Sequence, residues 1–178
     1  MKQSTEYIVK AIQQTLEAEI EGTDKFVDTI LGARKVFLYG VGRSGLIAKA
    51  FAIRLVQMGL EVFFVGETIT PIVEEGNVVI IVSYTGETMS AIQTANIVRR
   101  VGAKVVTITA NTHSKLANAS NLVILIHPPK DDERKLLAPL GTLFEDTTLV
   151  YLDAIVATLM EKLGQSEGSM RKRHSIWV

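Results

Sequence analysis

Two loops of the sequence combine glycine with hydroxyl or basic side chains in spacings that suit anion binding. Gly40–Gly45 reads GVGRSG and carries Arg43 and Ser44 within a G-x-G-x-x-G spacing. Ser83–Thr88 reads SYTGET and places one serine and two threonines around a glycine. Backbone N–H groups and hydroxyls that converge at a helix start can bind a phosphate monoester, and the helix dipole adds about 0.3 to 1 kcal/mol. Both loops are therefore candidate anion sites.

Each loop also has other interpretations. Glycines at a strand-to-helix turn allow a tight bend and close packing, and serine and threonine are common turn formers and helix caps, a role open to Ser83, Thr85 and Thr88. The first loop also fits a dinucleotide site, in which Glu67 would bind the ribose. The spacing alone leaves these interpretations open.

The elements that must position the two loops alternate between apolar strands and helices. Strands are predicted at residues 35–40, 61–65, 77–84, 104–109 and 122–126, with helices at 45–58, 87–101 and 114–119. Continuously apolar strands separated by helices favour a parallel sheet covered on both faces. The predicted fold is thus a three-layer αβα sandwich with a five-stranded parallel sheet, Rossmann-like or flavodoxin-like. Ligands of such sheets bind beyond the carboxyl ends of the strands, where both loops lie.

Two helical segments flank this core. Apolar residues at three-to-four spacing predict a helical lead-in over 1–34 with a break near Gly22, ahead of a βα core over 35–127. A long helix is predicted over 142–163, followed by a tail over 164–178, and the whole chain is interpreted as one domain. Because the long helix is apolar nearly all round from 147 to 160, we expect it to lie in a subunit interface.

Composition narrows the classes of function. The 178 residues contain 19 basic and 19 acidic side chains, so no global field attracts nucleic acid or an anionic membrane. The absence of cysteine excludes disulfides, thiolate metal sites and cysteine nucleophiles. The N-terminus lacks the pattern of a signal peptide, and the most apolar stretch, 149–160, contains Asp153 and is too short to span a bilayer. We expect a cytoplasmic protein.

The two loops together resemble the SIS (sugar isomerase) family, whose phosphate loop has the pattern Ser-x-Ser-Gly-x-Thr. Ser83, Thr85, Gly86 and Thr88 match it, with a threonine that keeps the hydroxyl of the second serine. The stretches GVGRSG, RLVQMG, FVGETITP, PLGTLFEDT and RKRH extend the resemblance to the 6-phospho-3-hexuloisomerases over nearly the whole chain. These enzymes interconvert 3-hexulose 6-phosphate and fructose 6-phosphate through a cis-enediolate.

The resemblance implies a place in the ribulose monophosphate pathway of formaldehyde assimilation, with hexulose-6-phosphate synthase as pathway neighbour. It implies a homodimer or homotetramer and neither cofactor nor metal, and it opens the alternatives of another aldose-ketose isomerase or a non-catalytic sugar-phosphate-binding module. We predict that Glu145 and His174 are catalytic. Further substrate contacts are predicted from Arg43, Ser44, Arg54, Glu67, Ser83, Tyr84, Thr85, Gly86, Glu87 and Thr88.

The two catalytic candidates each have a structural alternative. Moving a carbonyl between neighbouring carbons requires a base and a group that stabilises the enediolate. Glu145 matches the position of the base in the hexuloisomerases, but Thr142–Glu145 is also the pattern of a capping box. Asp146 is the weaker carboxylate. His174 lies in RKRH, either a solvated basic tail or, with Ile176–Val178 as an apolar anchor, a segment that docks near an active site.

Two rival functions use the same features. A nicotinamide-binding protein would use the first glycine loop and Glu67, but the chain has too few residues for a second, substrate-positioning domain. A sugar-phosphate sensor of the kind found in SIS-containing transcription regulators would require a separate DNA-binding domain, and residues 1–34 are too few for a three-helix reader. In related phosphoheptose isomerases a glutamate aligns with Arg54, so the base must come from elsewhere in this chain.

Overall fold

Five short strands form one parallel sheet in the computed structural model, which describes residues 1–174. Their order across the sheet is β2-β1-β3-β4-β5. The register aligns Val36 with Val62 and Val78, and Val78 with Lys104. The bounds are β1 Val36–Gly40, β2 Val62–Phe64, β3 Val78–Val82, β4 Lys104–Thr109 and β5 Leu122–Leu125.

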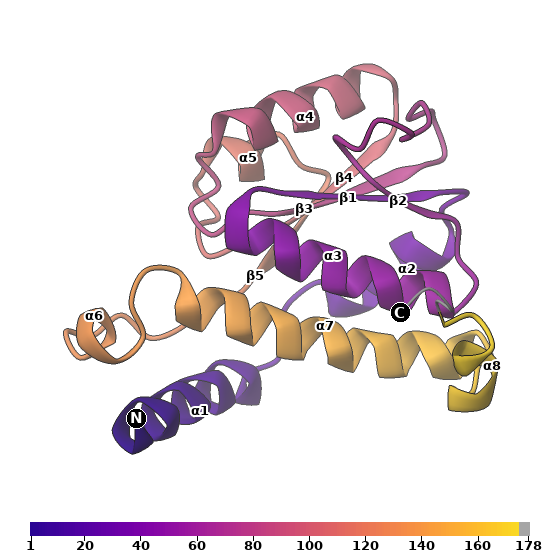
Figure 1. The fold of residues 1–178 in the computed structure, drawn as a ribbon. Helices are drawn as coiled ribbons and strands as arrows, with labels where there is room; N and C mark the ends of the chain where they lie inside the picture. Colours follow the sequence, from indigo (N-terminus) through magenta and orange to yellow (C-terminus); the bar gives the residue numbers. More distant parts are fainter. Residues whose placement is uncertain (175–178) are drawn as a thin grey trace.

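Helices cover both faces of this sheet (Figure 1). One face packs on α2 (Thr23–Leu31), α3 (Gly42–Gln57) and α7 (Thr142–Lys162), and the other on α4 (Met89–Arg100) and α5 (Lys115–Asn118). Successive side chains of a strand point to opposite faces, so Leu38 and Ile80 join the first core while Phe37 and Ile81 join the second. Burial on both faces explains why the strands are apolar without alternation.

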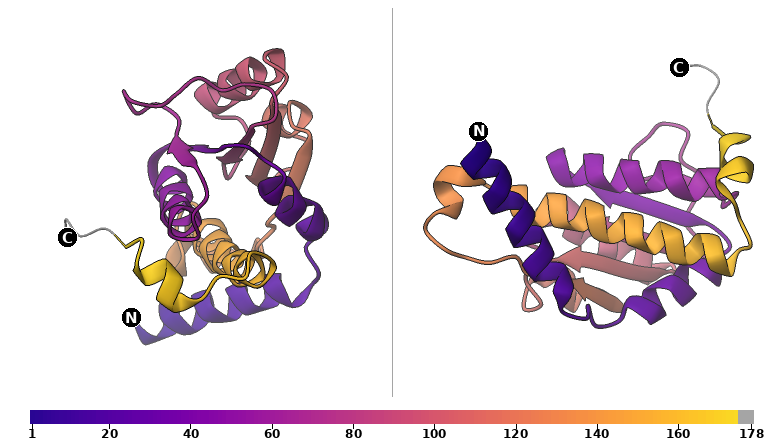
Figure 2. Two further views of the ribbon diagram at one scale, coloured as in Figure 1. Left: turned by 90° about the vertical axis from the view of Figure 1, so that its right-hand side faces the viewer. Right: turned by 90° about the horizontal axis from the view of Figure 1, so that it is seen from below.

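Helix α1 (Lys2–Glu17) lies outside these layers, on the outer side of α7 (Figure 2). Ala11 is buried there against Leu143 and Ala138. The predicted break near Gly22 is confirmed, since α1 ends before it and α2 begins after it. Two short helices were not predicted: α6 (Arg134–Leu137) and α8 (Glu167–Arg171), each shorter than the window in which helical periodicity can be recognised.

The long helix α7 is covered more fully within the chain than its sequence indicates. It contacts α1, α2 and α3, and Ile155 is only 2% exposed in the chain's own core. Burial on several sides, which we expected a second subunit to supply, thus comes from the chain itself, with α2, α3 and the sheet on the inner side of α7 and α1 on its outer side. The subunit interface stays a prediction. Among the described residues, no helix is both long and apolar enough to cross a membrane.

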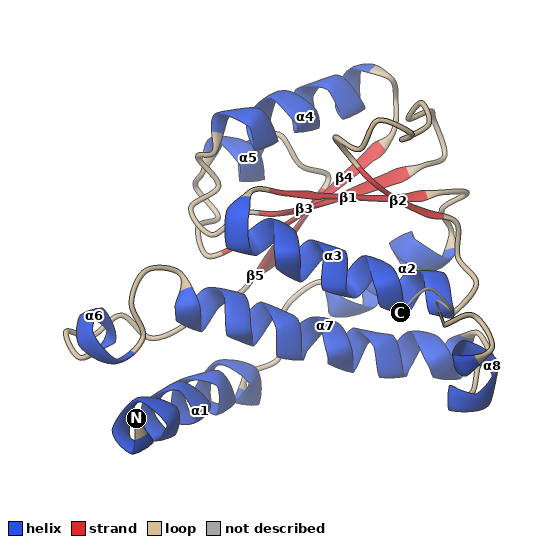
Figure 3. Ribbon diagram, viewed as in Figure 1, coloured by secondary structure: helices blue, strands red, loops and turns tan. Residues whose placement is uncertain are grey.

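The two candidate loops lie at the point where the direction of the chain across the sheet reverses. From β1 the chain crosses through α3 to β2 at one edge, whereas from β3 it crosses through α4 to β4 on the other side. Because β1 and β3 are neighbours, the loops after them leave adjacent strands toward opposite faces (Figure 3). This switch point is where open parallel sheets bind their ligands.

Candidate active site

A buried glutamate lies next to the first loop. Glu145, in the first turn of α7, is 7% exposed, and both its carboxylate oxygens have a donor on α3. The Ser44 hydroxyl donates to Oε1 at 3.1 Å, and Arg43 Nε lies 3.2 Å from Oε2. The start of α7 is thereby attached to the start of α3, at the carboxyl end of the sheet.

The Arg43 guanidinium contacts several side chains at the start of α7. It also contacts the carboxylate of Asp146 and donates to the Thr142 hydroxyl at 3.2 Å. The Arg43 side chain nevertheless remains 48% exposed, so one part of it faces the solvent beside Glu145. A cation in this position can stabilise negative charge that develops on a substrate oxygen.

The structure contradicts the capping-box interpretation of Glu145. A capping box requires the glutamate carboxylate to accept the backbone N–H of the helix-capping residue. Here Gly141 is the capping residue, and Thr142 donates both its hydroxyl and its N–H to the Pro139 carbonyl, at 2.7 and 3.3 Å. The Glu145 carboxylate is instead committed to side chains of α3, which leaves no helix-capping function to account for it.

The second loop connects β3 to α4 and brings its hydroxyls together. The Ser83 hydroxyl lies 3.5 Å from that of Thr88, and Thr88 precedes α4 without capping it through its side chain. The Thr85 hydroxyl accepts the N–H of Glu87 at 3.2 Å, as the turn interpretation predicted. Two hydroxyls thus meet at the start of a twelve-residue helix, a position that suits a phosphate.

Contacts with α5 hold this loop in place. Gly86 has φ of +67°, and a Cβ there would lie 2.1 Å from Ser114 Oγ, so no other residue fits. Glu87 accepts the backbone N–H of Lys115 at 3.0 Å, and its second oxygen lies 3.6 Å from Lys115 Nζ. The carboxylate of Glu87 therefore helps to fix the loop, and its predicted contact with substrate stays a prediction.

The geometry of the first loop opposes the dinucleotide interpretation. A pyrophosphate would bind at the N-terminus of α3, but there Ser44 donates to the Glu145 carboxylate. A second anion at that position would meet like charge. Glu67, the candidate ribose ligand, lies 3.1 Å from Lys49 Nζ of α3.

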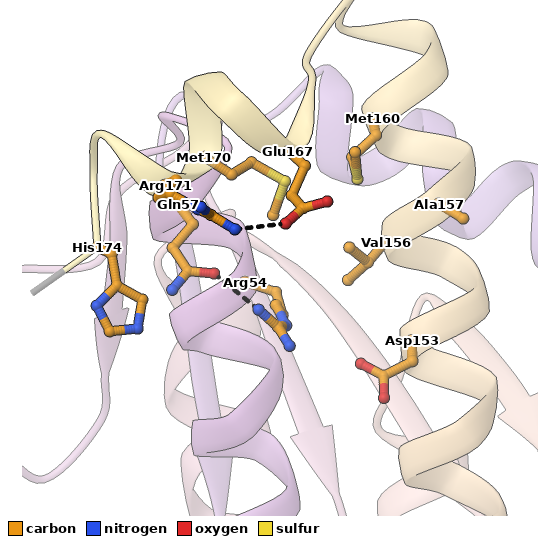
Figure 4. Close-up of a pocket in the computed structure, with 10 residues that line it drawn as sticks. All are labelled: Arg54, Gln57, Asp153, Val156, Ala157, Met160, Glu167, Met170, Arg171 and His174. Atoms are coloured by element: carbon orange, nitrogen blue, oxygen red, sulfur yellow. Dashed lines mark hydrogen bonds and ion pairs between the residues drawn. The ribbon is translucent and has the colours of Figure 1, made fainter.

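Two predicted site residues lie at the opposite end of α3 and α7 (Figure 4). Arg54 follows Arg43 by about three helical turns, or about 16 Å along the axis, and donates to Gln57 at 3.1 Å. With Asp153, His174 and other residues it lines a cavity of about 490 Å³. One chain therefore does not bring Arg54 or His174 to Glu145. The predicted apolar anchor, 176–178, lies outside the described residues.

Sequence reasoning missed Arg134 and the contact between Tyr84 and Phe144. Arg134 belongs to the four-residue α6 and donates to the Tyr84 hydroxyl, and the rings of Tyr84 and Phe144 lie 5.2 Å apart. The only available signal was that Arg134 closely precedes the PLGTLFEDT stretch. Within residues 1–174 no three histidine, aspartate or glutamate side chains gather in a way that suits a metal ion.

Comparison with known proteins identifies the family. Residues 29–157 match the family model described as SIS domain. The chain belongs to the SIS domain family. This confirms the predicted family, and the five-stranded parallel sheet flanked by helices confirms the predicted fold.

Individual SIS proteins are similar to this chain over nearly its whole length. The 3-hexulose-6-phosphate isomerase of Bacillus subtilis is 37% identical over 180 residues, which cover 97% of each chain. A solved Methanococcus jannaschii structure, from which a 3-hexulose-6-phosphate isomerase function has been inferred, is 30% identical with a TM-score of 0.85, covering 98% of this chain and 97% of that one. An Escherichia coli protein solved in complex with a sugar-phosphate ligand is 25% identical, also with a TM-score of 0.85, covering 98% and 95%.

Proposed function

We propose that this SIS protein is a 6-phospho-3-hexuloisomerase that interconverts 3-hexulose 6-phosphate and fructose 6-phosphate. The observation that carries the proposal is the buried Glu145, held by Arg43 and Ser44 beside a phosphate-type loop at the switch point of the sheet. The full-length similarity to 3-hexulose-6-phosphate isomerases supports the choice of substrate.

The chemistry requires the transfer of one carbon-bound proton and one hydroxyl proton, together with stabilisation of one oxyanion. The hydroxyls of Ser83 and Thr88, with the N-terminus of α4, bind the phosphate. Glu145 removes the proton from C2 of 3-hexulose 6-phosphate, and Arg43 stabilises the charge on O3 of the 2,3-enediolate. Return of that proton to C3, with transfer of the hydroxyl proton from O2 to O3, gives fructose 6-phosphate.

A second chain supplies the remaining groups in this proposal. Arg54 and His174 lie too far from the Glu145 of their own chain to share its substrate. His174 of a neighbouring chain would assist ring opening or protonate the carbonyl oxygen, which an imidazole can do near neutral pH. The site would then be complete only in a homo-oligomer.

The outer face of α3 is a suitable surface for such an oligomer. Leu46, Ile53 and Val56 are 65%, 58% and 45% exposed, and residues seven positions apart on a helix share one face. Val150 of α7 is also 44% exposed. We therefore place the interface on α3 rather than on Ile155, which the chain's own core covers.

Solvent isotope exchange tests the proposed reaction. The protein is incubated with fructose 6-phosphate in deuterium oxide, and the sugar is followed by proton NMR. Deuterium at C3 is expected for a 2-keto/3-keto isomerase. Exchange at C1 would instead identify an aldose-ketose isomerase. Tight binding without exchange would identify a non-catalytic sugar-phosphate-binding module.

A further inference from the structure

Arg134 joins two segments that the proposed reaction needs but that lie far apart in the sequence. Its Nη1 donates to the Tyr84 hydroxyl and to the Leu140 carbonyl, both at 3.1 Å. Tyr84 belongs to the loop after β3, and Leu140 precedes α7 by two residues. The Nε–H group of Arg134 is buried and has no hydrogen-bond partner. Because a buried unpaired N–H is unfavourable, the hydrogen bonds of Arg134 alone do not explain why this side chain lies here.

The Tyr84 end of this bridge belongs to the phosphate loop. Tyr84 lies between Ser83 and Thr85, and its carbonyl accepts both the Ala110 N–H and the Thr109 hydroxyl at 3.1 Å. Its backbone is thus fixed to the end of β4. The Tyr84 hydroxyl therefore gives Arg134 a contact with a fixed part of this loop, next in sequence to Ser83.

The Leu140 end of the bridge adjoins a glycine that packs against the Glu145 carboxylate. Leu140 has φ of +59°, a left-handed conformation that a leucine adopts only when its surroundings impose it. The next residue, Gly141, packs against the Glu145 carboxylate so closely that a Cβ on it would lie 3.2 Å from Cδ. A shift of this turn would move the carboxylate.

Helix α1 anchors the segment that carries Arg134. The Tyr7 hydroxyl donates to Asp131 Oδ1 at 2.7 Å, and the same oxygen accepts the backbone N–H of Arg134 at 2.9 Å. Burial and this hydrogen bond raise the pKa of Tyr7 to about 12. Helix α1 thus fixes the backbone of Arg134 through Asp131, while the guanidinium contacts the loop after β3 and the turn before α7.

We propose that Arg134 is a positioning residue that couples occupancy of the Ser83–Thr88 loop to the placement of the Glu145 carboxylate. A phosphate that orders the loop fixes Tyr84, and Arg134 passes this restraint to the turn at Leu140 and Gly141. The inference rests on the proposed function, because it assigns the loop to phosphate and Glu145 to proton transfer.

Kinetics of a matched set of variants test the coupling. Arg134→Gln removes the bridging guanidinium, whereas Tyr84→Phe removes only the accepting hydroxyl and keeps the ring against Phe144. Each is expected to lower kcat about tenfold to a hundredfold while KM stays within about threefold, because a small misplacement of the base costs turnover rather than binding. Lys135→Gln is the control, because the exposed Lys135 side chain pairs with the exposed Asp132 just before α6.

The double variant separates a bridge from two independent contacts. If Arg134 and Tyr84 act through the same hydrogen bond, the double variant Arg134→Gln/Tyr84→Phe loses no more activity than Arg134→Gln alone. Multiplied losses would overturn the proposal. An unchanged kcat in Arg134→Gln would overturn it as well, and that outcome would leave the isomerase proposal intact.

Hydrogen exchange gives a readout that does not depend on activity. Saturating inorganic phosphate is expected to slow amide exchange in the wild-type protein both at 83–88 and at 141–147. In Arg134→Gln the protection at 83–88 remains and that at 141–147 is lost. Protection at 141–147 that survives in Arg134→Gln, or that is absent in the wild type, overturns the coupling. Coupling by phosphate in a protein that fails to exchange fructose 6-phosphate protons would sustain this inference and refute the proposed function.

Discussion

The two ends of the α3–α7 helix pair differ in how their charged residues are used. At the carboxyl end of the sheet, Arg43 contacts both Glu145 and Asp146, and Ser44 donates to Glu145. At the other end, Arg54 and Asp153 line an open cavity of about 490 Å³ (Figure 4). We call the first the closed end, because its polar side chains contact one another, and the second the open end, because its residues line a cavity.

This difference indicates that hydrogen-bond donors are already fixed in place in only one half of the proposed site. At the closed end the donors are already fixed around the carboxylate, so little reorganisation is needed when charge develops. At the open end an isolated chain leaves a cavity beside Arg54 and His174. We interpret the closed end as the base half of the site, and the open end as the half that a neighbouring chain uses.

The largest expected effect comes from removing the base at the closed end. Glu145→Gln keeps the shape of the side chain but cannot accept a proton, so kcat should fall by about 10² to 10⁴ while substrate binding survives. Steady-state isomerisation rates and binding of fructose 6-phosphate measure the two quantities. Asp146→Asn is the matched control and should cost much less. A fully active Glu145→Gln protein would remove the distinction between the two ends.

The open end is tested by complementation. His174→Ala should lower turnover by about 10² without loss of folding, and Lys172→Ala, an exposed neighbour, should not. Mixed oligomers of His174→Ala and Glu145→Gln chains should regain part of the activity, because one mixed site contains both intact groups. No regain despite demonstrated subunit exchange would refute a site shared between chains.

The phosphate loop should affect binding more than turnover. Ser83→Ala and Thr88→Val each remove a hydroxyl next to the phosphate, and loss of one hydrogen bond to a charged group weakens binding by about 1.5 to 3 kcal/mol. KM should therefore rise about tenfold to a hundredfold. Thr94→Val, on the exposed side of α4, provides the control. Normal KM values in both loop variants would show that the loop is only a turn and does not bind the phosphate.

The proposed interface predicts a change in assembly. Ile53→Glu places a charge on the exposed face of α3 and should yield smaller species in sedimentation experiments, with folding retained. Ile97→Glu on α4 is a matched control, because Ile97 is 57% exposed and Ile53 58%. A monomeric wild-type protein at micromolar concentration would contradict both the interface and the shared site.

The smallest expected effect concerns the hydrogen bond from Tyr7 of α1 to Asp131, in the segment that carries Arg134. Because burial and the bond to Asp131 raise the pKa of Tyr7 to about 12, the folded protein retains this proton more strongly than the unfolded chain. Stability that is present below about pH 10 should therefore decline as the pH rises toward about 12. Tyr7→Phe should show a shallower decline of melting temperature across this window. Parallel curves for the two proteins would show that Tyr7 does not contribute to it.

The sequence predicted the sheet well because its inner strands, β1, β3 and β4, are largely buried on both faces. Short continuous apolar runs bounded by glycine or polar residues are typical of such strands, and the predicted strands at 77–84 and 104–109 contain the observed β3 and β4. The two loops follow from the same pattern, since glycine and hydroxyl residues directly after such strands fall at the carboxyl end of the sheet.

The polar contacts of the site were less predictable because they join residues distant in sequence. The pattern Thr142-x-x-Glu145 fits a helix cap and a catalytic base equally, and only the approach of Ser44 from α3 excludes the capping box. Arg54 and Arg43 lie on one helix, yet their separation along its axis puts them at opposite ends of the chain's fold. Arg134 is part of a helix too short to have a recognisable period.

Gly42 offers a chemical probe of this arrangement. It begins α3 with φ of +60°, and a Cβ built on it meets no atom within 4 Å. An ordinary side chain would strain the backbone there, but a D-alanine introduced by semisynthesis has the mirror-image preference and would fit without strain. Its methyl group would take the other position on the Gly42 Cα and would add bulk to the first turn of α3, next in sequence to Arg43. A folded semisynthetic protein that no longer accepts the sugar would therefore reveal, by steric exclusion, that the substrate passes over the first turn of this helix.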